Sequence, residues 1–237
     1  MTTIEANLQQ VRERIARSCQ RAGRDARDVT LLAVSKTFDA DAVRQAQAAG
    51  QRVFGENYVQ EGVEKIQLLR SDDPSNPLEW HCIGPLQSNK SRLVAEHFDW
   101  VQSVDRLKIA QRLSEQRPER LAPLQVCIQV NVDGGANKSG VAPGELLALA
   151  QGVVGLPRLR LRGLMSVPEP VVGFEAQRDV FLQVKALFDD LNARGFSLDT
   201  LSLGMSDDLD AAVAAGSTMV RVGRAIFGSR PARVSSA

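Results

Sequence analysis

The segment VTLLAVSKT, residues 29–37, is an apolar run that ends in a serine, a lysine and a threonine. A short run of this kind is typical of a strand buried on both faces, as in a parallel sheet covered by helices. An open doubly wound sheet would favour G-x-G-x-x-G after its first strand, but Ser35, Lys36 and Thr37 stand there instead. The segment therefore favours a closed barrel over an open sheet.

Short apolar runs alternate with longer segments of helical period along the rest of the chain. The predicted strands are 29–35, 52–54, 79–83, 100–104, 124–132, 159–165, 200–203 and 219–222. The predicted helices are 4–22, 39–49, 57–69, 90–96, 106–116, 144–154, 175–194 and 207–215, with a last turn at 225–226. Repeated strand-then-helix units predict an α/β fold, a single (β/α)8 TIM barrel with an extra N-terminal helix; an open doubly wound sheet is the alternative. We expect one domain over residues 1–230 and a short flexible tail over 231–237.

Composition limits the classes of function. Hydrophobic residues make up 43% of the 237 residues, which is typical of a globular chain with a large core. The net charge of +1, from 29 basic and 28 acidic side chains, favours neither nucleic acid nor an anionic membrane as a partner. Cys19, Cys82 and Cys127 form no C-x-x-C pair, so we expect reduced thiols and no metal site. No secretory signal or membrane-spanning run is evident, and we expect a cytoplasmic protein.

Functional groups of such barrels project from the C-terminal ends of the strands. Lys36 follows the first predicted strand, and a partly desolvated lysine amine there would react with carbonyl groups; the alternative is a surface lysine that starts a loop. Asn57 follows the second strand, where it would contact a ligand, cap its helix, or do both. We expect His81 to be a hydrogen-bonded packing residue and His97 to lie at the surface.

The loops after the last two predicted strands have the composition of a phosphate site. Ser206 would donate its hydroxyl group, Gly223 would let the backbone approach a ligand, and the amide of Arg224 would face the anion. In the alternative, Ser206 caps a helix and Arg221 forms a structural ion pair. A lysine that faces a phosphate site indicates a phosphorylated aldehyde, and pyridoxal 5′-phosphate is the evident candidate.

Motifs in order along the chain resemble those of the pyridoxal phosphate homeostasis proteins. They are LAVSKT at 32–37, FGENYVQE at 54–61, WHCIGPLQSNK at 80–90, NKSG at 137–140, GLM at 163–165, LGMSDD at 203–208, GSTMVRVG at 216–223 and AIFG at 225–228. The resemblance implies a barrel like the N-terminal domain of alanine racemase without that enzyme's second domain.

The resemblance also implies the roles of the site residues. The cofactor would form a Schiff base with Lys36, Arg221 would face the pyridine nitrogen, and Ser206, Gly223 and Arg224 would surround the phosphate. Arg224 replaces the small hydroxyl residue of many members of that family, so only its backbone contact carries over.

Two further positions concern a second cofactor site. Phe38 stands where some bacterial members have a second lysine, which argues against a lysine-rich secondary site. A secondary site that involves Lys138 is left open.

Two functions remain to be distinguished: a non-catalytic carrier in vitamin B6 homeostasis that delivers the cofactor to apo enzymes, and an amino-acid racemase of fold type III. A racemase of the alanine type needs a second base, a tyrosine from another domain, but the single tyrosine here is Tyr58. An arginine at the pyridine nitrogen also makes the ring a weaker electron sink. The sequence favours a carrier, with any racemase-like activity weak. It does not fix the oligomeric state, and we expect a monomer because nothing needs to be supplied by a second chain.

Overall fold

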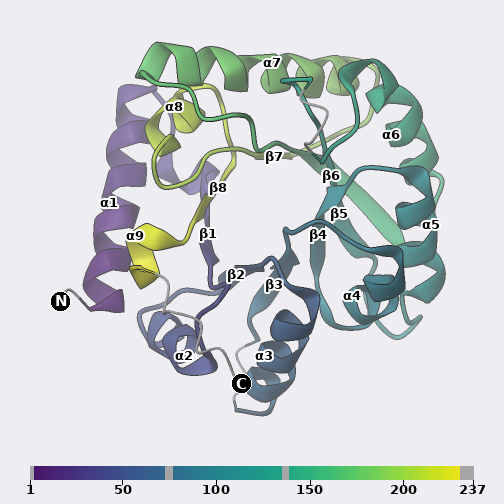
Figure 1. Ribbon diagram of the computed structural model, residues 1–237. Coiled ribbons are helices and arrows are strands. Elements are labelled where there is room, and N and C mark those ends of the chain that lie inside the picture. Colours follow the sequence, from purple (N-terminus) through teal and green to yellow (C-terminus); the bar gives the residue numbers. More distant parts are fainter. Residues whose placement is uncertain (1–2, 73–76, 135–138, 230–237) are drawn as a thin grey trace, which may run out of the picture.

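The computed structural model describes residues 3–72, 77–134 and 139–229. Its centre is a closed barrel of eight parallel strands in chain order, in which the last strand pairs with the first. Figure 1 looks along the barrel and shows the helices arranged around the ring of strands. This is the predicted (β/α)8 architecture, and the closure of the ring rules out an open sheet. The predicted tail, 231–237, lies outside the described residues.

The strands are β1 Thr30–Val34, β2 Val53–Glu56, β3 Glu79–Cys82, β4 Trp100–Val104, β5 Leu124–Gln129, β6 Leu159–Met165, β7 Thr200–Ser202 and β8 Met219–Val222. The α-helices in the described part of the chain are α1 Ile4–Arg21, α2 Ala40–Ala48, α3 Val59–Asp72, α4 Ser91–His97, α5 Leu107–Gln116, α6 Leu146–Val154, α7 Phe174–Ala193, α8 Leu209–Ala214 and α9 Arg224–Phe227. Single turns of 3-10 helix lie at Ala26–Asp28, Ser88–Lys90 and Pro143–Glu145.

Side chains at the helix starts explain why the first two helices begin where they do. The Thr3 hydroxyl accepts a hydrogen bond from the Ala6 amide, 3.1 Å away, at the start of α1. The Asp39 carboxylate accepts one from the Ala42 amide, 2.9 Å away, at the start of α2. Each bond satisfies an amide that lacks a partner within the helix.

Apolar side chains fill the layer between the strands and the surrounding helices. The largest fully buried ones include Phe54, Trp80, Phe98 and Phe181. Close approach between strands also depends on Gly163 of β6, because a Cβ there would lie 1.6 Å from the carbonyl oxygen of Thr200 in β7. The strands thus form a tightly packed frame that fixes the loops at their C-terminal ends.

The barrel interior is more polar than this outer layer. Gln102 of β4 accepts a hydrogen bond from Ser202 of β7, 2.7 Å away. These strands are not neighbours in the sheet, so the bond crosses the interior. His81, Gln102, Ser202 and Arg221 are all buried, although barrels of this class are usually filled by branched apolar side chains.

Within the described ranges, none of the helices combines the length and apolar character that crossing a membrane requires.

Candidate functional site

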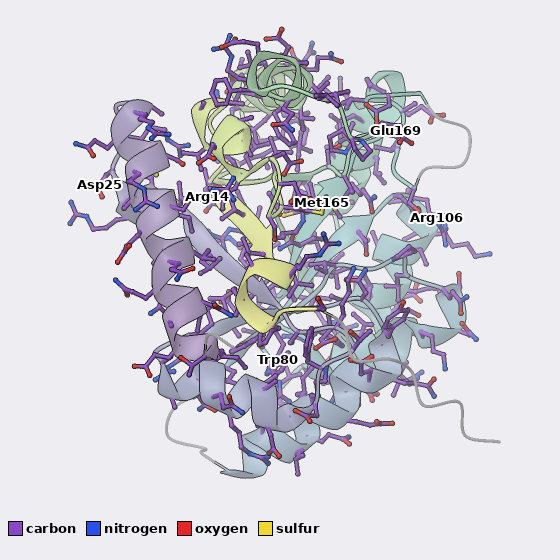
Figure 2. The ribbon with its side chains drawn as sticks, turned by 60° about the vertical axis from the view of Figure 1, so that its left-hand side comes forward. Arg14, Asp25, Trp80, Arg106, Met165 and Glu169 are labelled. Carbon is purple, nitrogen blue, oxygen red and sulfur yellow. The ribbon has the colours of Figure 1, made fainter. Side chains whose placement is uncertain are left out.

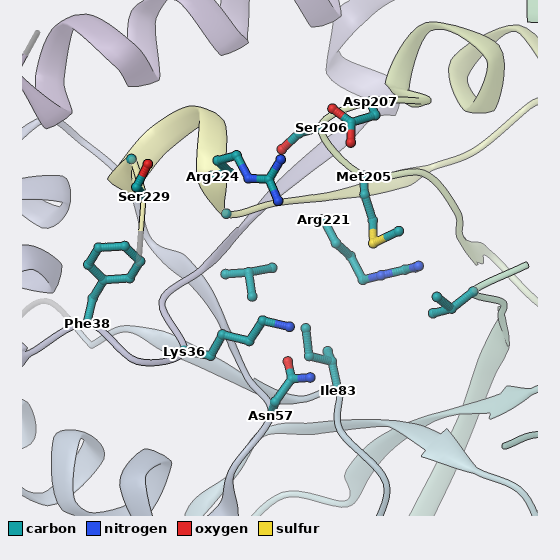
Figure 3. Close-up of a pocket in the computed structure, with 14 residues that line it drawn as sticks. Lys36, Phe38, Asn57, Ile83, Met205, Ser206, Asp207, Arg221, Arg224 and Ser229 are labelled. Atoms are coloured by element: carbon teal, nitrogen blue, oxygen red, sulfur yellow. The ribbon is translucent and has the colours of Figure 1, made fainter. Parts of the chain in front are cut away.

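A cavity of about 670 Å³ lies beside the C-terminal ends of the strands and brings the predicted site residues together. It is lined by Lys36, Asn57, Ser206, Arg221, Gly223 and Arg224, with Val34, Phe38, Ile83, Val167, Met205, Asp207, Gly228 and Ser229. Figure 3 shows Lys36 and Asn57 along one side of the pocket and Ser206 and Arg224 along the other. Residues from the first, second, seventh and eighth strand-to-helix loops thus face one space.

Lys36 stands in a tight turn directly after β1. The Phe38 amide donates to the Ser35 carbonyl, 3.1 Å away, and Thr37 between them has a φ of 69°, in the left-handed region. A threonine rarely adopts this conformation because its branched side chain crowds the backbone. The carboxylate of Glu61 accepts a hydrogen bond from the Thr37 amide, 2.6 Å away, and holds the turn in place.

A buried ion-pair network lies behind this turn. The Lys65 ammonium donates to Glu56 Oε1 at 2.8 Å, to Glu61 Oε1 at 2.7 Å and to the Ser35 carbonyl at 2.9 Å. The Ser35 hydroxyl also donates to Glu56 Oε1, 2.7 Å away. Burial raises the pKa of Glu56, although Lys65 and Ser35 act to lower it. Because a buried charge is costly without partners, this network ties α3 and β2 to the turn that carries Lys36.

Arg221 of β8 is a buried guanidinium whose orientation is set by three hydrogen bonds. Nη1 donates to the Ser202 carbonyl at 2.6 Å and to the Ser202 hydroxyl at 2.8 Å, and Nη2 donates to the Ser166 carbonyl at 2.8 Å. Burial lowers the pKa of Arg221 to about 10, so the group stays charged at neutral pH. The oxygen atoms that accept these bonds are uncharged. Among the described residues, the bonds to Arg221 therefore include no ion pair of the kind considered from the sequence.

Asn57 lies between β2 and α3 and offers an amide group to the pocket. Its Oδ1 atom is buried and has no hydrogen-bond partner within the described part of the chain. α3 begins only at Val59, two residues later than predicted, and the Gly62 amide donates to the Tyr58 carbonyl, 2.9 Å away. Asn57 therefore does not cap this helix, and its buried oxygen stands ready for a ligand donor.

The loops after β7 and β8 form the opposite side of the pocket. Ser206 is half-buried, and its carbonyl accepts a hydrogen bond from Arg14 of α1, 2.6 Å away. The alternative in which Ser206 caps a helix is wrong, because α8 begins at Leu209 and its N-cap position is held by Asp208. The Asp208 carboxylate instead accepts from the Met205 amide, 2.6 Å away, which shapes the loop around Ser206.

Gly223 joins β8 to α9 and packs closely against β1. A Cβ atom at this position would lie 3.1 Å from the Val34 carbonyl oxygen, so a larger residue would push the two strand ends apart. Arg224, the first residue of α9, is exposed at the rim, and Figure 3 shows its guanidinium beside Ser206. This end of the pocket thus combines a hydroxyl group, a close backbone approach and a cation.

The remaining candidate residues lie elsewhere. His81 is buried, bonded to Glu79 and Gln102, which confirms the packing role. His97 ends α4 and is half-buried rather than fully at the surface. Cys19, Cys82 and Cys127 are free and buried. Figure 2 shows the side chains on the barrel seen from the side of α1.

Lys138, considered for a second cofactor site, lies outside the described residues, as does Asn137 of the same motif. Within residues 3–72, 77–134 and 139–229, no group of three or more His, Cys, Asp or Glu side chains is arranged to hold a metal ion.

Sequence reasoning missed the structural roles of several residues of the site. Phe38 lies against Phe227 of α9, with ring centroids 5.2 Å apart, and thereby links the Lys36 turn to the last helix. Ser166 and Ser202 hold Arg221, and their positions at the ends of β6 and β7 are the one signal that could have identified them. Nothing local in the sequence identifies Lys65, because its partners come from three separate segments.

Comparison with known proteins points to one family. Residues 6–231 match the family described as alanine racemase, N-terminal domain. The chain is 58% identical over 230 residues to the pyridoxal phosphate homeostasis protein of Pseudomonas aeruginosa, covering 97% of each chain.

Solved structures with the same fold include a relative from this family and a more distant enzyme. The PipY protein of Synechococcus elongatus with pyridoxal phosphate bound is similar with a TM-score of 0.82 and 36% identity, covering 95% of this chain and all of that one. Alanine racemase from Corynebacterium glutamicum is 16% identical with a TM-score of 0.65, covering 96% of this chain and 62% of that one, so the likeness is one of fold.

Proposed function

The chain belongs to the pyridoxal phosphate homeostasis proteins, within the alanine racemase N-terminal domain family, and we propose from this membership that it binds pyridoxal 5′-phosphate and serves in vitamin B6 homeostasis. The observation that carries the proposal is the convergence of the Lys36 amine and the Arg221 guanidinium on one cavity. The PipY relative whose structure contains pyridoxal phosphate supports the choice of ligand.

The residues of the pocket fit this cofactor. Its aldehyde, when bound, condenses with a lysine amine, and Lys36 is the only lysine that lines the cavity within the described residues. Ser206, Gly223 and Arg224 would hold the phosphate, Asn57 would use its unpaired oxygen to accept from a ligand donor, and Arg221 would face the pyridine nitrogen. The guanidinium has no proton acceptor, so it would keep that nitrogen unprotonated.

We propose a carrier rather than an amino-acid racemase. Tyr58, the single tyrosine of the chain, is 49% exposed and does not line the cavity, which supports the view that no tyrosine of this chain acts as a second base. The rim is open as well, because Met205 and Arg224 at its edge are exposed. An open rim suits exchange of the cofactor better than chemistry from which water is excluded.

The proposal extends to surroundings and partners. We place the protein in the cytoplasm, and its three buried free thiols fit a reducing compartment. The apo forms of pyridoxal phosphate enzymes would be the recipients of the cofactor. We propose a monomer, since all the residues assigned to the cofactor come from one chain.

Borohydride reduction of the protein loaded with pyridoxal phosphate, followed by peptide mapping, tests the assignment. We expect a pyridoxyl group on Lys36 and the loss of visible absorbance on reduction. Lys36→Ala should abolish the label, whereas Lys108→Ala, at an exposed position on α5, should leave it unchanged. A label on another lysine, or none, would overturn the proposal.

A further inference from the structure

A continuous series of hydrogen bonds crosses the barrel interior from the pocket to the opposite end of the barrel. Arg221 Nη1 lies 2.8 Å from Ser202 Oγ, and Ser202 Oγ lies 2.7 Å from Gln102 Oε1. Gln102 Nε2 lies 2.8 Å from His81 Nδ1, and His81 Nε2 lies 2.8 Å from Glu79 Oε1. We call these five residues the donor chain.

The two ends of the donor chain fix the direction of every bond. A guanidinium only donates, so Ser202 Oγ accepts a hydrogen bond from Arg221. The single hydroxyl hydrogen of Ser202 is then donated to Gln102 Oε1. The amide nitrogen of Gln102 then donates to His81 Nδ1. His81 therefore carries its proton on Nε2 and donates to the carboxylate of Glu79. A single amide orientation and a single histidine tautomer satisfy all four bonds.

The histidine ring in this series is held by aromatic stacking as well as by its hydrogen bonds. Its ring stacks on Trp100 with centroids 4.9 Å apart and an interplanar angle of 10°. The guanidinium of Arg162 lies 4.8 Å from the Trp100 ring centroid and pairs with Asp199 at 2.7 Å. The ring of His81 therefore has little freedom to turn and break either of its hydrogen bonds.

Burying these polar side chains in the barrel interior costs free energy, and they do not fill the space better than apolar side chains would. His81, Gln102 and Ser202 are each wholly or almost wholly inaccessible to solvent. Polar groups are tolerated in a low-dielectric interior when each of them has a hydrogen-bond partner. In a series of hydrogen bonds that all point the same way, each bond also polarises the next. The one member that also lines the cavity is Arg221.

We propose that His81, Gln102 and Ser202 are positioning residues, which hold the Arg221 guanidinium at the angle that presents its remaining N–H groups to the pyridine nitrogen of the cofactor. The three bonds to Ser202 and Ser166 use three of the five N–H groups, which leaves two for the ligand among the contacts of the described residues. This inference rests on the proposed function for the identity of the ligand. The geometry of the donor chain itself does not depend on it.

A double-mutant cycle tests the coupling in the full-length protein. His81→Phe keeps an aromatic ring against Trp100 but removes the acceptor for Gln102. We expect it to raise the dissociation constant for pyridoxal phosphate about five-fold and to shift the visible absorbance of the bound cofactor. His97→Phe is the matched control, since this histidine lies on α4 outside the barrel, and it should change neither quantity.

The second part of the double-mutant cycle tests whether His81→Phe acts on Arg221 through Ser202. Ser202→Ala removes the hydroxyl group that joins Gln102 to Arg221 and leaves the bond from Arg221 to the Ser202 carbonyl, so adding His81→Phe to it should cause no further change in the dissociation constant. Additive effects of the two substitutions would overturn the proposal. His81→Asn should restore part of the lost affinity, because its Oδ1 takes the place of Nδ1 as acceptor, whereas a merely structural role for the ring would not distinguish Asn from Phe in this way.

Nitrogen-15 NMR of the cofactor-free protein separates this inference from the proposed function. His81 should show the Nε2-protonated tautomer, and the Arg221 guanidinium should rotate slowly in the wild type and measurably faster in His81→Phe. If no variant binds pyridoxal phosphate but these signals appear, the proposed function fails and the donor chain stands. A His81 protonated on Nδ1, or an unchanged Arg221 signal in His81→Phe, would overturn the donor chain itself.

Discussion

Gly223 and Ser206 show how two small residues shape the end of the pocket to which we assign the phosphate. Gly223 allows the β8–α9 junction to approach the Val34 carbonyl, where a Cβ would lie at 3.1 Å. Ser206 offers its hydroxyl to the cavity while its own carbonyl is held by Arg14. Neither residue contributes a charge, so their effect on a ligand would come from hydrogen bonding and from space.

We expect Ser206→Ala to raise the dissociation constant for pyridoxal phosphate roughly ten-fold, the usual cost of a hydrogen bond to a charged group. Gly223→Val should raise it further, because the side chain would displace the strand ends and block the approach to the backbone. Fluorescence titration measures both. Gly144→Val, at a glycine with open space around it and no positive φ, is the control.

Titration with pyridoxal, which has no phosphate group, checks the assignment. The wild-type protein should bind it much more weakly than the phosphate ester, and Ser206→Ala should affect it little. Equal affinity of the wild type for the two compounds would show that these loops are not a phosphate site.

Among the elements, α1 has the clearest link to the pocket. Its Arg14 donates to the Ser206 carbonyl and pairs with Asp210 of α8, with Nη2 2.8 Å from Oδ2. The Ser18 hydroxyl also donates to the Asp210 carboxylate. Burial acts to raise the pKa of Asp210, but the bonds from Arg14 and Ser18 outweigh it and lower this pKa below its usual value.

The lowered pKa of Asp210 predicts a specific loss of stability in acid. Because this pKa is lower in the folded than in the unfolded chain, its contribution is present above the unfolded value of about 3.9 and is lost as the pH falls through the folded value. Asp210→Asn should reduce the free energy of unfolding by about 1 kcal/mol at pH 7, a modest figure because the pair is about one-third exposed.

Urea unfolding at a series of pH values measures this effect. The difference between wild type and Asp210→Asn should shrink steadily below about pH 4. Asp189→Asn, which breaks a more exposed pair with Lys185 on α7, should cost less at pH 7. A difference that persists undiminished in acid would mean that Asp210 does not stabilise the fold through its charge.

Most helices and strands could be predicted because their hydrophobic periodicity and the residues that end them are local features of the sequence. β4, β6 and β8 have the bounds that the apolar runs predict. β5 is shorter than its apolar run because Val130 pairs instead with Val141 in an isolated bridge, which depends on a residue that is remote in sequence. The end of the first apolar run also located Lys36, whereas Arg221 lies inside the last run and its role came from the family resemblance.

The contacts around those residues could not be predicted in the same way. Ser202 and Gln102 are separated by 100 positions, and only closure of the barrel brings them within hydrogen-bonding distance. Lys65 looks like an ordinary helical lysine until α3 packs on β2 and buries it beside Glu56. Sequence patterns identify which residues face the pocket, whereas three-dimensional packing determines what orients them.

At the scale of the whole molecule, the proposed role as a carrier predicts that the bound cofactor exchanges. We expect the loaded protein to restore activity to an apo transaminase at least as well as an equal amount of free cofactor, and not to turn over common amino acids at useful rates. Recovered transaminase activity and a panel of amino acids assayed by chromatography measure the two expectations. Lys36→Ala, mixed with the same amount of cofactor, is the control for delivery from the Schiff base.

Multiple turnover on any one amino acid, abolished by Lys36→Ala, would instead support the racemase-like alternative. Failure to transfer the cofactor, with no turnover, would leave a binding protein that stores it. The two outcomes therefore separate an enzyme from a carrier and a carrier from a reservoir.

The pairing of β1 with β8 has a consequence for the order in which the protein acquires its ligand during synthesis. Lys36 follows the first strand of the barrel, and Arg221, Gly223 and Arg224 belong to the last strand and the turn after it. A ribosome makes the chain from its amino end at about 5–20 residues per second, so the lysine emerges early, while its neighbours across the pocket are still untranslated. A nascent chain that has not yet released β8 has no closed ring and lacks the residues that face Lys36 across the pocket, so the complete pocket forms only after β8 has been made.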